Sequence, residues 1–193
     1  MEKIIRKLTL AEGEDIYSTR LVKDFPACEV KPWERIKQLV NQGAYEMFGM
    51  LEESMLLAYG FVVKNPEESW VMMDYFAVSK SFRGKGYGQY FLRHLWELYP
   101  KISGVIFEVE DVSEAKNEQE KVMRERRIRF YQRAGLQLYS VYAKVYDADY
   151  QLMYYRREGN MPEPKALIEG YKKLYQVILG PEKLEKYVMI QAK

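Results

Sequence analysis

An arginine, a lysine and three glycines stand together at residues 83–88, shortly after an apolar segment. The apolar segment is Tyr75-Phe-Ala-Val78, and the loop reads Arg83-Gly-Lys-Gly-Tyr-Gly88. Glycines let backbone N–H groups converge, and the positive end of a following helix adds to their effect. The loop is therefore typical of an anion site, most often one for phosphate, and Arg83 and Lys85 would add positive charge beside it.

The spacing of these glycines excludes two common nucleotide-binding loops. A Walker loop requires Lys-Ser or Lys-Thr after its second glycine, and neither Gly86 nor Gly88 is followed by such a pair. The dinucleotide-binding loop G-x-G-x-x-G also fails, because the third glycine comes one residue early, at Gly88. The remaining pattern is R-x-x-G-x-G, formed by Arg83, Gly86 and Gly88.

This pattern resembles the loop of the Gcn5-related N-acetyltransferase (GNAT) superfamily. There, a [QR]-x-x-G-x-[GA] loop holds the pyrophosphate of acetyl-CoA, and the preceding strand presents its backbone to the pantetheine arm. A second segment, Phe130-Tyr-Gln-Arg-Ala-Gly-Leu136, looks like the family's helix end F-Y-x-[KR]-x-G-[FL]. The resemblance implies acetyl-CoA as acetyl donor, bound by Phe76, Ala77, Val78, Arg83, Gly84, Lys85, Gly86, Tyr87 and Gly88.

The reaction implied by this resemblance is direct attack of an amine on the acetyl thioester in a ternary complex. Such an amine is almost fully protonated near pH 7, so a base that removes its proton helps, and the leaving thiolate benefits from a proton donor. Tyr131 matches the family's helix tyrosine and is the expected general acid. Three carboxylates are candidates for the base: Asp74 on the cofactor-binding strand, and Glu108 and Glu110 on one face of the next strand. Asp74 and Glu110 are favoured, and a water molecule could instead relay the proton.

One position departs from the family pattern. The family often has an asparagine about seven residues before the helix tyrosine, and Arg124 stands there in this chain. Any cofactor contact made by that asparagine is therefore not expected here.

Apolar periodicity and turn-forming residues predict the element order β-α-α-β-β-β-α-β-α-β-β, followed by a helix at 165–179. The strands are expected at 4–8, 44–51, 55–63, 70–78, 104–110, 137–145 and 150–156. Together with the resemblance, this order implies an α/β (α+β), GNAT-like acyl-CoA N-acyltransferase fold. Its central sheet would be mixed and mostly antiparallel, with splayed middle strands, and flanked by helices.

A change in composition near Gly159 predicts the domain organisation. Pro162 and Pro164 follow this glycine as a short linker. We expect a GNAT N-acetyltransferase domain at 1–156 and a C-terminal helical extension at 157–193. The extension would pack on the same domain or on a second subunit in a homodimer.

The composition narrows the class of protein. The 193 residues include 30 Lys and Arg against 28 Asp and Glu, and this near balance argues against nucleic-acid or membrane partners. A single cysteine, Cys28, excludes an internal disulfide, and a single histidine, His94, makes a histidine-rich metal site or catalytic triad improbable, so no metal is expected. The first residues lack the apolar run of a signal peptide, so we expect a soluble, cytoplasmic protein.

The expected function is acetyl-CoA-dependent N-acetylation of a primary amine on a small molecule or a peptide. The alternative is a non-catalytic module of the same fold that binds acyl-CoA as a sensor or binds a partner protein. The intact glycines together with Tyr131 favour the enzyme, and no residue pattern identifies the acceptor amine.

Overall fold

The computed structural model describes residues 3–193, so Met1 and Glu2, which open the expected domain 1–156, lie outside the described residues. The chain forms two compact units. One comprises the residues up to Lys64 together with Met73–Pro100, and the other comprises Asn65–Met72 and Lys101–Lys193. Within 3–193, no helix combines the length and apolar character needed to cross a membrane.

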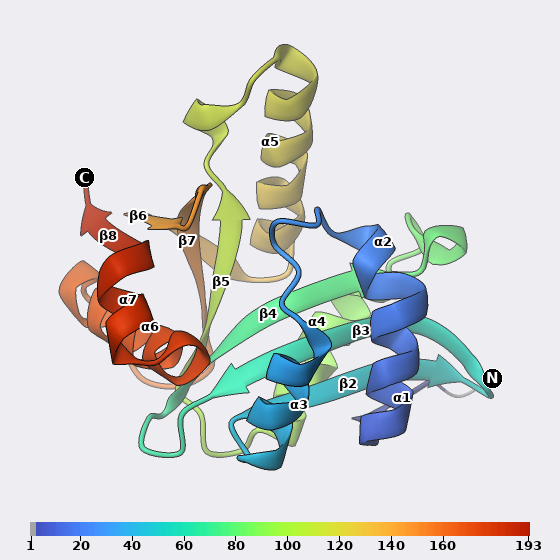
Figure 1. The fold of residues 1–193 in the computed structure, drawn as a ribbon. Helices are drawn as coiled ribbons and strands as arrows, with labels where there is room; N and C mark the ends of the chain where they lie inside the picture. Colours follow the sequence, from blue (N-terminus) through green and yellow to red (C-terminus); the bar gives the residue numbers. More distant parts are fainter. Residues whose placement is uncertain (1–2) are drawn as a thin grey trace. The chain divides into compact units, whose positions relative to one another are not determined.

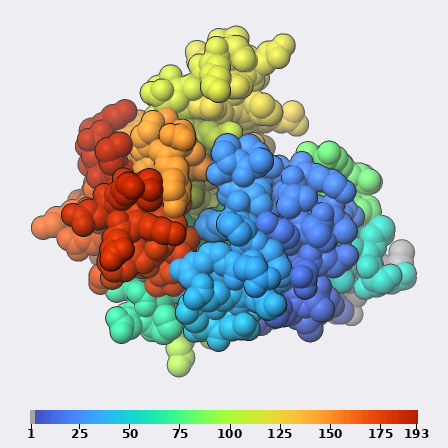
Figure 2. Space-filling model, in the orientation of Figure 1, coloured from blue at the N-terminus to red at the C-terminus, as the bar shows by residue number. Residues whose placement is uncertain are grey.

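The first unit is built on strands β1 (Lys3–Lys7), β2 (Tyr45–Glu52), β3 (Met55–Lys64) and most of β4 (Trp70–Val78), adjacent in that order. The β1–β2 and β2–β3 pairs are antiparallel. Helices α1 (Leu10–Ile16), α2 (Val22–Asp24) and α3 (Trp33–Asn41) cover the near face of these strands in Figure 1, and α4 (Tyr87–Leu95) lies behind them. The blue segments α1–α3 make up much of this unit's visible surface in Figure 2.

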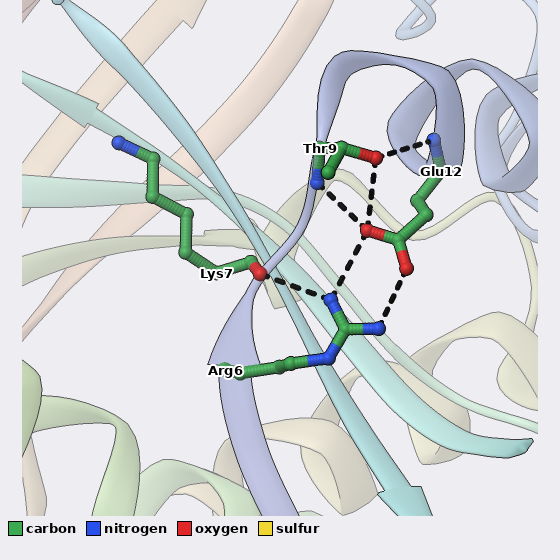
Figure 3. A network of polar contacts seen from close by, with 4 residues as sticks. All are labelled: Arg6, Lys7, Thr9 and Glu12. Atoms are coloured by element: carbon green, nitrogen blue, oxygen red, sulfur yellow. Dashed lines mark hydrogen bonds and ion pairs between the residues drawn. The ribbon is translucent and has the colours of Figure 1, made fainter.

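A capping box fixes the start of α1 (Figure 3). The hydroxyl of Thr9 accepts a hydrogen bond from the backbone N–H of Glu12 at 3.2 Å, and the Glu12 carboxylate accepts one from the Thr9 N–H at 2.8 Å. Arg6 of β1 donates to the same carboxylate at 2.6 Å. The hydrogen bonds from Arg6 and Thr9 lower the pKa of Glu12 to about 2. The first strand and the first helix are thus joined by one charged contact.

The second unit contains β5 (Gly104–Glu110), α5 (Glu118–Arg133), β6 (Leu136–Val145), β7 (Ala148–Arg156), α6 (Pro164–Leu179), α7 (Pro181–Tyr187) and β8 (Val188–Ala192). Its strands lie in the order β5-β7-β6-β8, and every neighbouring pair is antiparallel. Helix α5 packs on β5 and β6, and α6 packs on β6 and β8. In Figure 1, α6 and α7 lie on the near side of these strands.

The predicted fold class and the predicted order of elements through residue 156 are confirmed. Two local details differ. The first predicted helix is interrupted by a π-helical turn at Tyr17–Leu21 before α2. The helix after the glycine loop begins at Tyr87, directly after Gly86, so it starts inside the loop pattern itself. The expected splay of the middle strands stays a prediction.

The sequence predicted a helical extension at 157–193, and the extension also contains a strand. After α6 and α7 the chain returns as strand β8, which pairs with β6 from Val141↔Ala192 to Val145↔Val188. The reason is that β6 would otherwise end the sheet with unpaired backbone N–H and C=O groups, and β8 satisfies them along this edge. Five residues, Val188–Ala192, are too short a run to show a clear strand period in the sequence.

Candidate active site

The glycine loop connects β4 to α4 within the first unit. Gly84 and Gly86 have φ angles of +78° and +82°, in the left-handed region that favours glycine. A Cβ built at either position meets no atom within 4 Å, so the space beside the loop is open. Gly86 is the N-cap of α4, and no side chain caps this helix end. The first amide groups of α4 can therefore bind an anion, as a pyrophosphate site requires.

The residues expected to bind acetyl-CoA differ in their exposure to solvent. Arg83, Gly84, Lys85 and Gly86 are exposed, whereas Ala77 and Gly88 are buried. The Phe76 ring stacks on Phe91 of α4, with centroids 5.4 Å apart. Side chains 76 and 77 thus serve the packing of this unit, and the strand offers a ligand chiefly its backbone, which is the contact that the family resemblance implies.

Arg83 is tied to two neighbouring groups. Its Nε donates to the carbonyl oxygen of Val78 at 3.0 Å, and its guanidinium pairs with Asp24 at 3.3 Å. The Asp24 side chain is only 8% exposed, and its other oxygen accepts a hydrogen bond from the Tyr59 hydroxyl at 3.1 Å. Burial and the Asp24 charge raise the pKa of Tyr59. Arg83 is thus oriented at the loop, but Asp24 neutralises part of its charge.

Asp74 lies on β4, and two neighbouring side chains donate hydrogen bonds to its carboxylate. Its side chain is 3% exposed, and Oδ1 accepts a hydrogen bond from the Lys31 ammonium at 2.7 Å. The Tyr45 hydroxyl donates to Oδ2. Burial, followed by the charge of Asp74, holds the pKa of Tyr45 well above its usual value. The carboxylate expected to be a candidate base is therefore part of a buried ion pair.

Glu110 and Tyr131 come together in the second unit through one arginine. Arg127, one helical turn before Tyr131 on α5, forms an ion pair with Glu110 at the end of β5. The buried Tyr131 ring packs against Phe107 of β5, with centroids 5.2 Å apart. Burial raises the pKa of Tyr131 to about 12, with the Arg127 charge opposing this shift and the Glu110 charge adding to it. The phenol therefore keeps its proton at neutral pH and can act as a donor.

Glu108, the third carboxylate, is engaged by the extension. The hydroxyls of Tyr171 and Tyr175, one helical turn apart on α6, donate to Glu108 Oε1 at 2.5 and 2.7 Å. Burial, with the Glu108 charge next in size, raises the pKa of Tyr171 well above its usual value. Residues 157–193 thus reach a candidate site residue of the second unit.

Arg124, which departs from the family pattern, has a structural explanation. Its guanidinium donates to the carbonyl oxygen of Asp111 and lies 3.7 Å from the Glu120 carboxylate. Its Nε is buried and has no hydrogen-bond partner among the described residues. The arginine therefore links the start of α5 to the chain segment that follows β5.

The predicted site residues fall in both units. The loop, residues 76–78 and Asp74 belong to the first unit, and Glu110 and Tyr131 belong to the second. The sequence analysis missed the partners that hold these groups: Lys31, Tyr45, Asp24, Tyr59 and Arg127. None of them lies in a recognisable motif, and each is brought to its partner by the fold.

Comparisons with known proteins support the family suggested by the loop. The family model of the acetyltransferase (GNAT) domain matches residues 44–137. A search of curated protein sequences gave no match. Among solved structures, a Bacteroides thetaiotaomicron protein assigned to the GNAT family shares 23% identity, with a TM-score of 0.72 over 92% of this chain and 99% of the other.

Two further structures have the same fold at lower identity. One is the ribosomal-protein-S18-alanine N-acetyltransferase from Escherichia coli, with 17% identity and a TM-score of 0.58 over 84% of this chain and 99% of that one. The other is a Bacillus subtilis acetyltransferase in complex with CoA, with 13% identity and a TM-score of 0.56 over 81% of this chain and 100% of that one. The resemblance to the GNAT superfamily is therefore confirmed: residues 44–137 match the model of its acetyltransferase domain, and the chain has the GNAT fold.

Proposed function

We propose that the protein is an acetyl-CoA-dependent N-acetyltransferase whose acceptor is a primary amine of a small molecule or peptide. The observation that carries this proposal is the glycine loop. Gly84 and Gly86 have positive φ angles and open space beside them at the uncapped start of α4. The loop lies inside the segment that matches the GNAT acetyltransferase domain.

Different residues of this chain bind different parts of acetyl-CoA. The amides at the start of α4 and the exposed Lys85 bind the pyrophosphate of acetyl-CoA, with Arg83 held beside them by Asp24. The backbone of residues 76–78 binds the pantetheine arm, since the side chains at 76 and 77 are engaged in packing. Bound acetyl-CoA supplies an activated acetyl thioester. The bond from the amine nitrogen to the acetyl carbon forms, and the carbon–sulfur bond breaks.

Two proton transfers complete the reaction. The Tyr131 hydroxyl donates a proton to the leaving sulfur, which its raised pKa of about 12 permits because the phenol is protonated at neutral pH. Glu110 or Asp74 accepts the proton of the amine, directly or through water. Glu110 is the more accessible of the two, with 26% of its side chain exposed against 3% for Asp74.

Both small-molecule amines and peptide amines are candidates for the acceptor. The E. coli neighbour is named for an alanine of a ribosomal protein, which is a peptide acceptor. Its 17% identity supports a shared fold, so small amines and peptide N-termini belong in the same screen. The cytoplasmic location and the homodimer expected from the sequence also stay predictions.

The test is calorimetric titration of acetyl-CoA into wild type, Gly86→Glu and Gly159→Glu. Both glycines have positive φ angles, +82° and +72°, and open space at Cβ, so the two substitutions cause similar backbone strain. Only the glutamate at 86 would place negative charge at the start of α4. We expect wild type and Gly159→Glu to bind acetyl-CoA and Gly86→Glu to lose binding.

Each outcome has a clear meaning. No binding by wild type, or equal binding by all three proteins, refutes the donor site. Binding that is lost only in Gly86→Glu justifies a screen of amines for release of CoA thiol. Binding with no thiol release for any amine class would support the acyl-CoA sensor instead of the enzyme.

A further inference from the structure

The two side chains of the ion pair between Asp74 and Lys31 differ in their exposure to solvent. The Asp74 side chain is 3% exposed, whereas the Lys31 side chain is 19% exposed. The carboxylate is fixed from the inside, because the Tyr45 hydroxyl donates to Oδ2 and Tyr45 is itself 1% exposed. The ammonium approaches the other oxygen, at 2.7 Å. Of the two side chains, that of Lys31 is thus the one that solvent reaches more.

An aromatic ring completes the surroundings of the ammonium. The Lys31 Nζ lies 5.1 Å from the centroid of the Tyr75 ring, within the range of a cation–π interaction. The Tyr75 hydroxyl accepts a hydrogen bond from the Lys31 backbone N–H at 2.9 Å and donates to the carbonyl oxygen of Glu29 at 2.7 Å. The Asp74 carboxylate and the Tyr75 ring therefore both lie at the Lys31 ammonium, and Tyr45 and the Tyr75 hydroxyl hold the surroundings in place.

The lysine comes from a segment that lies outside the helices and strands. Residues 26–32, between α2 and α3, form neither helix nor strand, whereas Asp74 and Tyr75 lie within β4. The backbone of the segment is held by hydrogen bonds with the hydroxyls of Tyr75 and Tyr17, and these bonds do not involve the Lys31 side chain. The ammonium can therefore leave Asp74 while the backbone of the segment keeps its contacts.

We propose that Asp74, Tyr45 and Tyr75 form the subsite for the ammonium group of the acceptor, and that Lys31 fills it as an internal competitor. This inference rests on the proposed function in taking the ligand as the acetyl acceptor. An incoming primary ammonium replaces one cation with another, so the buried carboxylate is never left unpaired. A neutral ligand would leave it unpaired, which is strongly unfavourable. The subsite thus selects a primary alkylammonium with a slender stem.

A second lysine–carboxylate pair, between Lys64 and Glu46, provides the matched control. Lys64 lies 2.8 Å from Glu46, with side chains 30% and 13% exposed. Glu46 also receives hydrogen bonds from Lys7 and from Tyr99, so removal of Lys64 leaves one cation in place. Removal of Lys31 takes away the one cation that the structure places on Asp74 among the ion pairs of residues 3–193.

The experiment is a titration of n-butylammonium chloride, which carries the four-carbon stem of lysine, without acetyl-CoA. The proteins are wild type, Lys31→Ala, Lys64→Ala and the double variant Lys31→Ala/Asp74→Asn. We expect Lys31→Ala to bind n-butylammonium roughly tenfold or more tightly than the other three, because a hydrogen-bonded charge contributes about that factor. Equal affinity for Lys31→Ala and the double variant would overturn the subsite.

Two further measurements keep the inference testable. Should Lys31→Ala fail to fold, Lys31→Met retains the stem without the ammonium, and methylammonium becomes the probe with the same expected order. With acetyl-CoA present, n-butylamine should release CoA thiol faster in Lys31→Ala than in Lys64→Ala. Ammonium binding without this difference would overturn the acceptor role. Loss of acetyl-CoA binding by wild type would instead refute the proposed function, while the titration without donor still decides the subsite.

Discussion

Replacement of Tyr131 by phenylalanine isolates the proposed proton donor. The variant keeps the ring that packs against Phe107 at 5.2 Å and removes only the hydroxyl. With a pKa of about 12, roughly one phenol in ten thousand is ionised at pH 8, so essentially every molecule has a proton to donate. Loss of a general acid lowers the turnover rate by about a hundredfold to ten-thousandfold. We expect such a fall in kcat, with little change in the KM for acetyl-CoA.

Tyr154→Phe is the matched control for this experiment. Tyr154 belongs to the same unit, is 1% exposed, and burial likewise raises its pKa to about 12. Removal of its hydroxyl therefore changes a buried, protonated phenol that the proposed mechanism does not use. The assay follows CoA thiol release with an accepted amine between pH 7 and 10, and thermal unfolding checks that both variants remain folded.

The pH profile and the size of the kcat change together test this role. Because the pKa of Tyr131 lies near 12, ionisation of this group should not produce a fall in the wild-type rate below about pH 11. A kcat in Tyr131→Phe within about threefold of wild type would refute the role of general acid. An equal loss of kcat in Tyr154→Phe would refute it as well, since the effect would then come from disturbed packing.

Three further predictions concern stability. Burial raises the pKa of Glu46, but hydrogen bonds from two lysines and a tyrosine outweigh it and lower the pKa to about 2. The ionised carboxylate therefore contributes roughly 2–3 kcal/mol to the free energy of unfolding, and this contribution should be lost as the pH falls from about 4.5 through 2. Acid unfolding should be less steep in Glu46→Gln, which lacks this group. Gly104→Ala should lower the free energy of unfolding by about 1–3 kcal/mol in denaturant titration, because its Cβ would lie 1.8 Å from the Tyr154 hydroxyl oxygen; an unchanged midpoint contradicts this clash. Tyr171→Phe removes a hydrogen bond to Glu108 and should cost about 1–3 kcal/mol in the same assay, and no loss would show that this bond is not stabilising.

The features that the sequence predicted well are local in the chain. The glycine loop depends on residues 83–88, whose backbone angles require glycine at 84 and 86. The segment 130–136 resembled the family's helix end, and its Gly135 has a φ angle of +97° directly after the last turn of α5. In both places one short segment specifies its own conformation, so neighbouring residue types are sufficient evidence.

The features that the sequence did not predict depend on residues far apart in the chain. Lys31 and Asp74 are separated by 43 residues, and Tyr171 and Glu108 by 63. Strand β8 also depends on a distant partner, since Val188–Ala192 becomes a strand where β6 offers an unpaired edge. Charge and residue type show that each side chain could make such a contact, and only the fold determines which contact is made.

These distant partners change the chemical problem at the candidate site. The carboxylates considered as the base are held by a lysine at Asp74, an arginine at Glu110 and two tyrosines at Glu108. These partners occupy carboxylate oxygens that a base must offer to the amine. An acceptor that arrives protonated can displace the Lys31 ammonium and then give its own proton to the carboxylate or to water. The positive charge that makes the amine unreactive would thus be the property that brings it to the base.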